Sequence, residues 1–303
     1  MKPSPDSPAP FVRKGALDAT AMVLLVVLCG SWGLQQVAIK ITNQMVPPLL
    51  QSGIRSGGAA VLLFTWMLAR RERLLERDGT LWWGIAAGLL FAGEFLLIYW
   101  GLDYTLASRS CIFLYVSPFV VALGATLFIP GENLNRVQVV GLCTAFLGLV
   151  CAFRESLGLP TMTMLIGDSM LVGAAVFWGA TTVMIKASPL VKIKPSKTLL
   201  YQLVVSAVVL LVASWLKNEP GIENVTPWII GSLFYQTVWV AFITYLVWFW
   251  LVRRYPPSRL ASFTFLTPIM GVLAGGMLLK EPISPLLILA LGLVGTGIYL
   301  VNR

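Results

Sequence analysis

The sequence predicts an all-α polytopic membrane protein in which ten transmembrane helices form two five-helix repeats of inverted topology. Three observations predict this fold: the composition, ten apolar runs of helical length, and motifs that recur about 150 residues apart. Of the 303 residues, 57% are hydrophobic and only 12% are charged, and the mean hydropathy is +0.83. Soluble chains are about 25% charged. A chain so poor in charge must bury most of its surface in a bilayer, which a helix of about 20 apolar residues can cross.

The apolar runs are long enough to cross a bilayer as helices. In lipid such segments satisfy their backbone hydrogen bonds only as helices, since the strands of a barrel would be shorter and would alternate in polarity. We expect a flexible tail at residues 1–14, which carries four prolines among its first ten residues, and no cleavable signal before the first span. The runs lie at about 19–41, 47–69, 81–102, 106–128, 135–153, 165–187, 198–216, 226–251, 258–279 and 283–301.

The distribution of charge predicts how the chain is oriented. Sixteen of the 22 basic residues lie on the side of the N-terminus, five lie on the other side, and Arg55 lies within a span. Because lysine and arginine mark cytoplasmic loops, we expect both termini in the cytoplasm of a bacterial cell, with the chain in the inner membrane. The net charge of +9 is therefore interpreted as an orientation signal, and nucleic acid is not an expected partner.

Histidine and cysteine usage argues against a metal site or a cofactor. The sequence has no histidine, and its four cysteines all lie in apolar runs without forming a C-x-x-C pair. Neither a zinc site nor a disulfide framework is indicated. We expect no cofactor and no enzymatic activity.

Short motifs recur in one order at offsets between 146 and 150, so we interpret residues 15–153 and 161–303 as repeats of one integral unit. The matches are Trp32, Gly33 and Lys40 with Trp178, Gly179 and Lys186; Trp100 with Trp250; Ser108, Arg109 and Pro118 with Ser258, Arg259 and Pro268; and Glu132 and Gly148 with Glu281 and Gly297. Five spans per repeat is an odd number, so the second copy must enter the membrane in the opposite sense. Inverted repeats are typical of secondary transporters, whose halves open alternately to either side.

The run WGLQQVAIK (Trp32–Lys40), followed by Pro47 and Arg55, resembles the opening of the drug/metabolite transporter superfamily in its ten-helix EamA-type exporter branch. The run YWGLDYTLAS (Tyr99–Ser108), Pro118 beyond it and Glu132 before the fifth span extend this resemblance over nearly the whole chain. The resemblance implies ten helices, an inverted repeat and export of small metabolites, amino acids among them. It leaves the substrate open.

Polar side chains occupy matching places in the first and sixth spans. Trp32 and Gln35 share one helical face, and Trp178 and Thr181 share the corresponding face in the second repeat. Polar groups inside a membrane either pair between helices or line a wet cavity. Both interpretations stand at this stage, and the repeat favours the cavity.

Glu94 and Arg55 are the carboxylate and the arginine that lie well inside predicted spans. An intramembrane ion is a functional hypothesis by default. The two side chains could neutralise each other as a structural pair. Alternatively, they could bind the amino and carboxylate groups of a substrate, or Glu94 could take up a proton. The sequence permits proton coupling without requiring it.

Aromatic residues lie in the corresponding third and eighth spans, with Phe95 and Tyr99 in one and Tyr245 and Trp248 in the other. Aromatic stripes usually face lipid or neighbouring helices, but an aromatic chamber would suit a hydrophobic or aromatic amino acid.

Two prolines, Pro118 and Pro268, lie near the middles of the fourth and ninth spans. Each removes a backbone N–H, which either bends the helix statically or provides a hinge for gating.

Taken together, these features favour a secondary transporter that exports small metabolites, foremost amino acids, by alternating access. A nucleotide-sugar or sugar-phosphate exchanger would need several basic residues in its cavity. A channel would not need paired halves, and an intramembrane aspartyl protease would need two facing aspartates deep in the membrane. The exact substrate, the energy coupling and the oligomeric state are left open.

Overall fold

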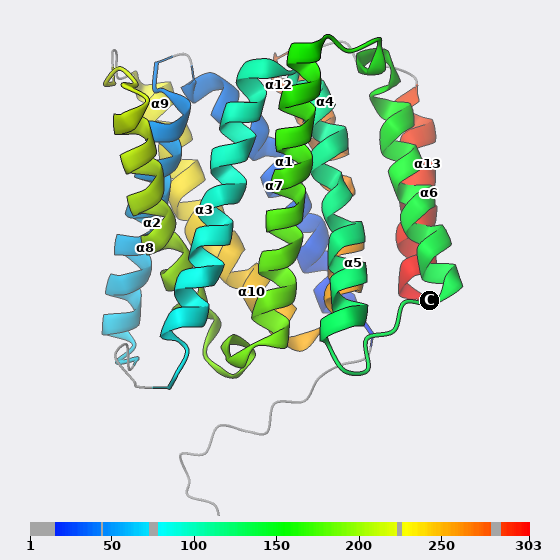
Figure 1. Cartoon of the computed structure of the whole chain (residues 1–303), viewed down its shortest axis with the longest axis horizontal. Helices are drawn as coiled ribbons and strands as arrows, with labels where there is room; N and C mark the ends of the chain where they lie inside the picture. Colours follow the sequence, from blue (N-terminus) through cyan, green and yellow to red (C-terminus); the bar gives the residue numbers. More distant parts are fainter. Residues whose placement is uncertain (1–15, 44, 73–77, 223–225, 280–285) are drawn as a thin grey trace, which may run out of the picture.

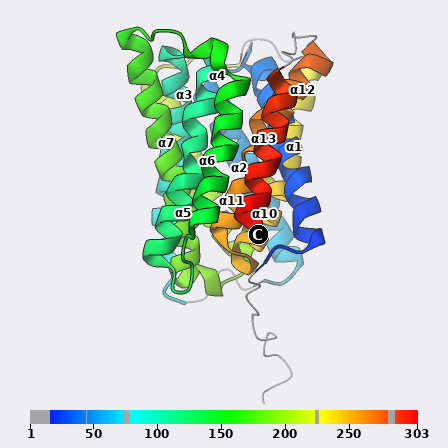
Figure 2. The same ribbon diagram turned by 90° about the vertical axis from the view of Figure 1, so that its right-hand side faces the viewer.

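The computed structural model describes residues 16–43, 45–72, 78–222, 226–279 and 286–303, and every regular element within them is a helix. The tail predicted at 1–14 and the repeat residue Glu281 lie outside the described residues. The helices stand side by side between an upper and a lower edge (Figures 1 and 2). Described in chain order, they make ten passes: α1 (Ala19–Thr42), α2 (Pro48–Ala69), α3 (Leu81–Tyr104), α4–η1–α5 (Ala107–Phe113, Leu114–Val116, Ser117–Phe128), α6 (Arg136–Ala152), α7 (Met162–Ala187), α8 (Pro195–Leu216), α9–η4–α10 (Pro227–Phe234, Tyr235–Thr244, Tyr245–Arg254), α11–α12 (Pro257–Phe263, Leu266–Leu279) and α13 (Leu286–Asn302).

The passes agree with the predicted runs to within a few residues at each end. By length and composition, seven helices in the described chain are able to cross a membrane. The two shorter apolar helices, α6 and α13, have 17 residues each. The remaining pass, α2, has 22 residues but carries a buried polar face. The all-α, ten-helix architecture that the sequence predicts is confirmed.

Helix starts follow local capping chemistry. The Asp18 carboxylate accepts a hydrogen bond from the backbone N–H of Ala21 at 2.9 Å, at the start of α1. Asn135 and Gln138 form a reciprocal capping box at the start of α6, which satisfies two backbone donors at once. The cap is Asn135, whose short side chain lies at the N-cap position itself.

The packing of the passes has the two-fold pattern of an inverted repeat. Passes α1 and α7 begin at opposite edges of the bundle (Figure 1). The α3–α7 contact has its counterpart in the packing of α1 against α9 and η4, and the α5–α7 contact corresponds to α1–α12. The repeat relates α2 to α8 and α6 to α13, and the two helices of each pair pack against each other. Each of these contacts therefore lies across the pseudo-two-fold axis. Figure 2 shows α6 and α13 side by side.

Glycines allow the closest of these contacts. A Cβ added at Gly297 of α13 would lie 2.5 Å from the carbonyl oxygen of Gly141 on α6, whereas one added at Gly295 would meet nothing within 4 Å. Small residues at helix crossings replace side-chain contacts with backbone packing in membranes. The motif glycine Gly297 therefore belongs to the contact between the two repeats.

The two passes with a proline near their middle, α4–η1–α5 and α11–α12, are interrupted shortly before that proline. Pro118 lies near the start of α5, directly after the 3₁₀ segment η1, in which Tyr115 leaves helical geometry with φ −85° and ψ 17°. Pro268 lies near the start of α12, and the chain turns between α11 and α12 with a bond from the Thr267 N–H to the Thr264 carbonyl at 2.9 Å. A missing N–H at each proline accounts for the loss of regular helix on its N-terminal side.

Candidate functional site: a central aromatic cavity

A cavity of about 160 Å³ lies between the two repeats, with walls from α1, α3, α4, η1, α7, α10 and α12. Nine of the ten residues that we predicted for a substrate cavity line it: Trp32, Gln35, Glu94, Phe95, Tyr99, Trp178, Thr181, Tyr245 and Trp248. The tenth, Arg55, is not part of the lining. Of the two predicted hinge prolines, Pro268 lines the cavity and Pro118 does not.

One wall is organised by Trp32 of α1. Its indole N–H donates a hydrogen bond to the Thr244 hydroxyl at 2.9 Å. Its ring meets Tyr245 and Trp248 edge to face, with centroids 6.1 and 5.4 Å away. Such contacts stabilise ring pairs beyond the burial of their area, so these side chains hold one another in place.

The facing wall has the equivalent tryptophan, Trp178, with different neighbours. Trp178 of α7 meets Tyr115 edge to face at 5.7 Å. The offset of 150 that relates Trp100 to Trp250 also relates Glu94 to Thr244. Where the second repeat presents a hydroxyl that accepts the Trp32 N–H, the first presents a carboxylate. The cavity therefore has Trp32 and Trp178 at equivalent places but a carboxylate from one repeat alone.

Arg55 packs against an aromatic ring that α3 contributes to the cavity wall. Phe91 and Phe95 pack at 5.0 Å, and the Arg55 guanidinium carbon lies 4.3 Å from the centroid of the Phe95 ring. Arg55 is 1% exposed, and none of its three guanidinium nitrogens has a hydrogen-bond partner in the part of the chain that the structure describes. A salt bridge between Arg55 and Glu94, one of our two interpretations, is thus not seen among these residues, and the guanidinium lies over the Phe95 ring instead.

Tyr115 is a lining residue that the sequence analysis missed. Its own sequence carries no polar periodicity that would single it out, and it reaches the cavity because η1 turns the backbone just before Pro118. The lining also includes Phe91, one turn before Phe95, and four immediate neighbours of predicted residues along the chain, namely Gln36, Thr182, Phe249 and Thr267.

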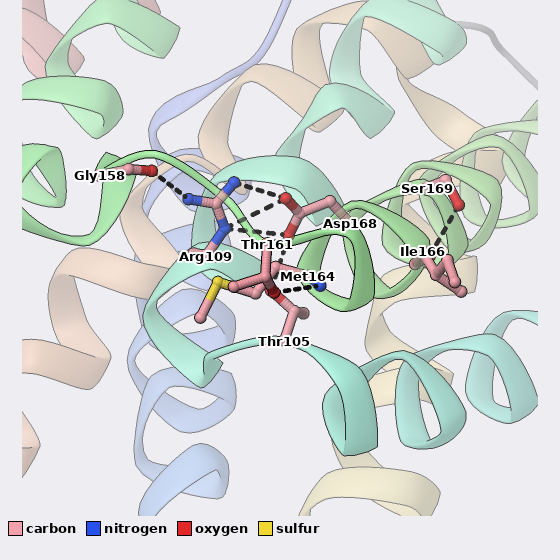
Figure 3. A network of polar contacts seen from close by, with 8 residues as sticks. All are labelled: Thr105, Arg109, Gly158, Thr161, Met164, Ile166, Asp168 and Ser169. Atoms are coloured by element: carbon pink, nitrogen blue, oxygen red, sulfur yellow. Dashed lines mark hydrogen bonds and ion pairs between the residues drawn. The ribbon is translucent and has the colours of Figure 1, made fainter.

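A second polar network joins the repeats outside the cavity, where the start of α4 meets the start of α7 (Figure 3). Arg109 donates from Nε to both Asp168 carboxylate oxygens at 3.1 Å and from Nη2 to one of them at 2.5 Å. The Thr105 hydroxyl donates to the same carboxylate at 2.7 Å. The two charged side chains are 5% and 6% exposed. Nothing in the local sequence predicts this contact, because Arg109 and Asp168 lie 59 residues apart along the chain.

The opposite edge has a counterpart to this network. The Tyr255 hydroxyl donates to the Asp18 carboxylate at 2.8 Å, and the repeat offset of 150 relates these residues to Thr105 and Asp168. Nearby, the Lys186 ammonium donates to the backbone carbonyls of Val252, Arg253 and Tyr255 at 2.8–3.1 Å. These carbonyls stand at the C-terminal end of α10, where a cation is favoured. Each network thus connects the end of the third pass of one repeat to the first pass of the other.

Among the described residues, no group of three or more side chains could hold a metal ion. The chemistry that the cavity offers is thus that of one carboxylate, several hydroxyl and amide groups, and aromatic rings.

The sequence matches known transporters over nearly its whole length. It is 29% identical over 281 residues to "Uncharacterized transporter YvbV" of Bacillus subtilis (strain 168), in an alignment that covers 92% of this chain and 90% of that protein. It is 26% identical over 291 residues to "Probable amino-acid metabolite efflux pump" of Escherichia coli (strain K12), covering 93% and 94%. A solved structure described as "Crystal structure of protein" has the same fold, with a TM-score of 0.81 at 17% identity over 94% of this chain and 96% of that one. Residues 19–154 and then residues 165–303 each match the EamA-like transporter family, and the chain belongs to that family.

Proposed function

We propose that this transporter exports small metabolites of the amino-acid type, hydrophobic or aromatic ones foremost, by alternating access. The observation that carries the proposal is the position and chemistry of the cavity, which lies between two inverted repeats and combines aromatic walls with the carboxylate of Glu94. A cavity of about 150 Å³ lined by apolar side chains is large enough for benzene. A cavity of about 160 Å³ therefore suits an aromatic or branched side chain. The relative named as an amino-acid metabolite efflux pump supports the same substrate class.

In such a cycle, the two polar networks between the repeats would close the cavity at the upper and lower edges of the bundle. In this proposal, opening at the upper edge requires the Arg109–Asp168 pair to separate, and opening at the lower edge requires Tyr255 to leave Asp18. Because the networks occupy equivalent places in inverted repeats, exchanging the conformations of the repeats would exchange which one is broken. The interrupted helices before Pro118 and Pro268 are the hinges that we propose for this exchange, since their backbone bonds are already incomplete there.

The cavity residues have distinct roles in this proposal. Trp32, Trp178, Tyr245 and Trp248 contact the apolar part of the substrate, while Gln35 and Thr181 offer hydrogen bonds. Phe95 and Tyr99 form the wall in front of Arg55. Glu94 provides negative charge and is the candidate for proton coupling. The lining has no lysine or arginine among its described residues, which disfavours phosphate-bearing substrates such as nucleotide sugars.

Counterflow into proteoliposomes tests the function. Vesicles that contain the purified full chain are preloaded with one unlabelled amino acid, and uptake of the labelled compound is followed with and without a pH gradient. We expect uptake of phenylalanine or leucine above that of protein-free vesicles, and a loss of uptake in Glu94→Gln. The matched control is Asp103→Asn, which removes a carboxylate from the same helix at an exposed position, 49% exposed and paired with Lys217. Exchange of sugar phosphates with no amino acid transported would refute the proposal.

We further propose that the protein lies in the bacterial inner membrane with both termini in the cytoplasm, as the sixteen-to-five bias of basic residues favours. A C-terminal fusion to green fluorescent protein should fluoresce, and a fusion to alkaline phosphatase should be inactive. Active phosphatase with no fluorescence would reverse the orientation.

A further inference from the structure

Within the proposed site, the charges that face the cavity have only one sign. Glu94 lies on α3, is 7% exposed and lines the cavity. Arg55 is absent from the lining and packs against the ring of Phe95, which does line it. The described lining thus offers a carboxylate and no cation to a bound molecule. A substrate carboxylate would meet aromatic rings and Glu94, whereas a substrate ammonium group would meet a counter-ion.

The comparison of the two repeats indicates that the carboxylate is left for a ligand. In the second repeat, the hydroxyl of Thr244 accepts the N–H of Trp32, so that this polar group is satisfied within the protein. Its counterpart Glu94 has no hydrogen bond and no salt bridge within the residues that the structure describes, and Arg55 acts on it only as a nearby charge. A buried carboxylate that no donor contacts is costly. A cationic ligand is the group that would remove this cost.

The rings around Glu94 also favour a cation. Phe91 and Phe95 flank it on α3, and Tyr245 meets Phe91 edge to face at 5.9 Å. The faces of tryptophan, tyrosine and phenylalanine attract ammonium groups, most strongly when water is excluded. The Phe95 ring already binds the guanidinium of Arg55 in this way. A carboxylate with aromatic faces beside it is an arrangement that binds primary and quaternary ammonium groups.

We propose that the transporter recognises its substrates through a positively charged amino group bound by Glu94 and the surrounding rings, and that a free substrate carboxylate is not required. This inference rests on the proposed function and narrows its substrate class. Amino-acid amides and arylalkylamines belong to that class together with the amino acids, and N-acylated amino acids do not.

The test uses four compounds that share one benzyl group: phenylalanine, phenylalanine amide, phenethyltrimethylammonium and N-acetylphenylalanine. The last compound has no positive charge, whereas the quaternary compound is permanently charged and has no carboxylate. Binding to the detergent-purified full chain is measured as the ligand-dependent rise in the midpoint of thermal unfolding, which follows the ratio of ligand concentration to Kd. Uptake of the labelled quaternary compound into proteoliposomes is measured in parallel.

We expect the three compounds with a positively charged nitrogen to raise the midpoint and the N-acetyl compound to leave it unchanged. In Glu94→Gln, the Kd of these three compounds should rise about tenfold or more, since the primary ammonium groups lose a charged hydrogen bond and the quaternary group loses its counter-ion. Asp103→Asn should bind all of them as the wild type does. Gel filtration and the ligand-free unfolding midpoint show whether each variant folds. If Glu94→Gln does not fold, the binding of the four compounds to the wild type still tests the inference.

The outcomes separate this inference from the proposed function. Phenylalanine transport without binding of the amide or the quaternary compound would refute the inference and leave the proposed function intact. Binding and uptake of the quaternary compound without transport of any amino acid would support the inference and refute the proposed function. N-acetylphenylalanine binding as tightly as phenylalanine, or unchanged binding in a folded Glu94→Gln, would overturn the inference.

Discussion

Replacing Asp168 with asparagine should lower the free energy of unfolding by about 3–5 kcal/mol, because it leaves the buried guanidinium of Arg109 without its counter-charge. The structure places the pair in this class, since the two side chains are only 5% and 6% exposed and are joined by several hydrogen bonds. The Lys217–Asp103 pair is the matched control. Its side chains are 37% and 49% exposed, so Asp103→Asn should cost about 0–1 kcal/mol.

Unfolding of the purified full chain in mixed detergent micelles, followed by circular dichroism, measures both costs. A double-mutant cycle with Arg109→Gln isolates the interaction. Each single change at the buried pair leaves an unpaired charge, so the double variant should lose clearly less stability than the sum of the two single variants. The reasoning would be wrong if Asp168→Asn cost no more than Asp103→Asn, or if the costs at Arg109 and Asp168 were additive.

Two further predictions concern helix packing and pH. Gly297→Ala should destabilise the protein by about 1–3 kcal/mol because the added Cβ would meet the backbone of the neighbouring helix. Gly295→Ala lies in the same helix with open space around its Cβ, so it should be neutral or stabilise the protein by up to about 1 kcal/mol. Equal effects of the two variants in thermal unfolding would contradict the packing argument. At Asp78, partial burial acts to raise the carboxyl pKa, but hydrogen bonds from Lys197 and Thr80 outweigh it and lower the pKa to about 2. Since this pKa is lower in the folded than in the unfolded state, its stabilisation is complete above about pH 4 and is lost as the pH falls toward 2. The unfolding midpoint of Asp78→Asn should therefore fall less than that of the wild type over this range, and parallel pH profiles would refute the assignment.

Much of the architecture could be predicted because its causes are local. A bilayer forces each long apolar run to satisfy its own backbone as a helix, so run lengths alone place the ten passes within a few residues. The interruptions before Pro118 and Pro268 follow in the same way from a missing N–H. Polar and aromatic residues at matching places in two repeats indicated eight of the cavity residues, since the fold brings equivalent helices to one axis, and its charge inside a span indicated Glu94.

Features that depend on pairing between distant segments could not be predicted. The sequence places Arg55 deep in a span, but only the packing of α2 against α3 puts its guanidinium against the Phe95 ring and outside the cavity lining. Tyr115 enters the lining through a turn in the backbone that its own neighbours do not specify.

The sequence by itself determined the membrane environment, the helix boundaries, the internal repeat and the family, because these depend on hydrophobicity and order along the chain. The tertiary structure alone decided which charges meet. It joined Arg109 to Asp168 and left Glu94 facing the cavity without a hydrogen-bond partner among the described residues. The physical reason is that the energy of a buried charge depends on what lies within a few ångströms of it, and in a helical bundle those neighbours come from other passes.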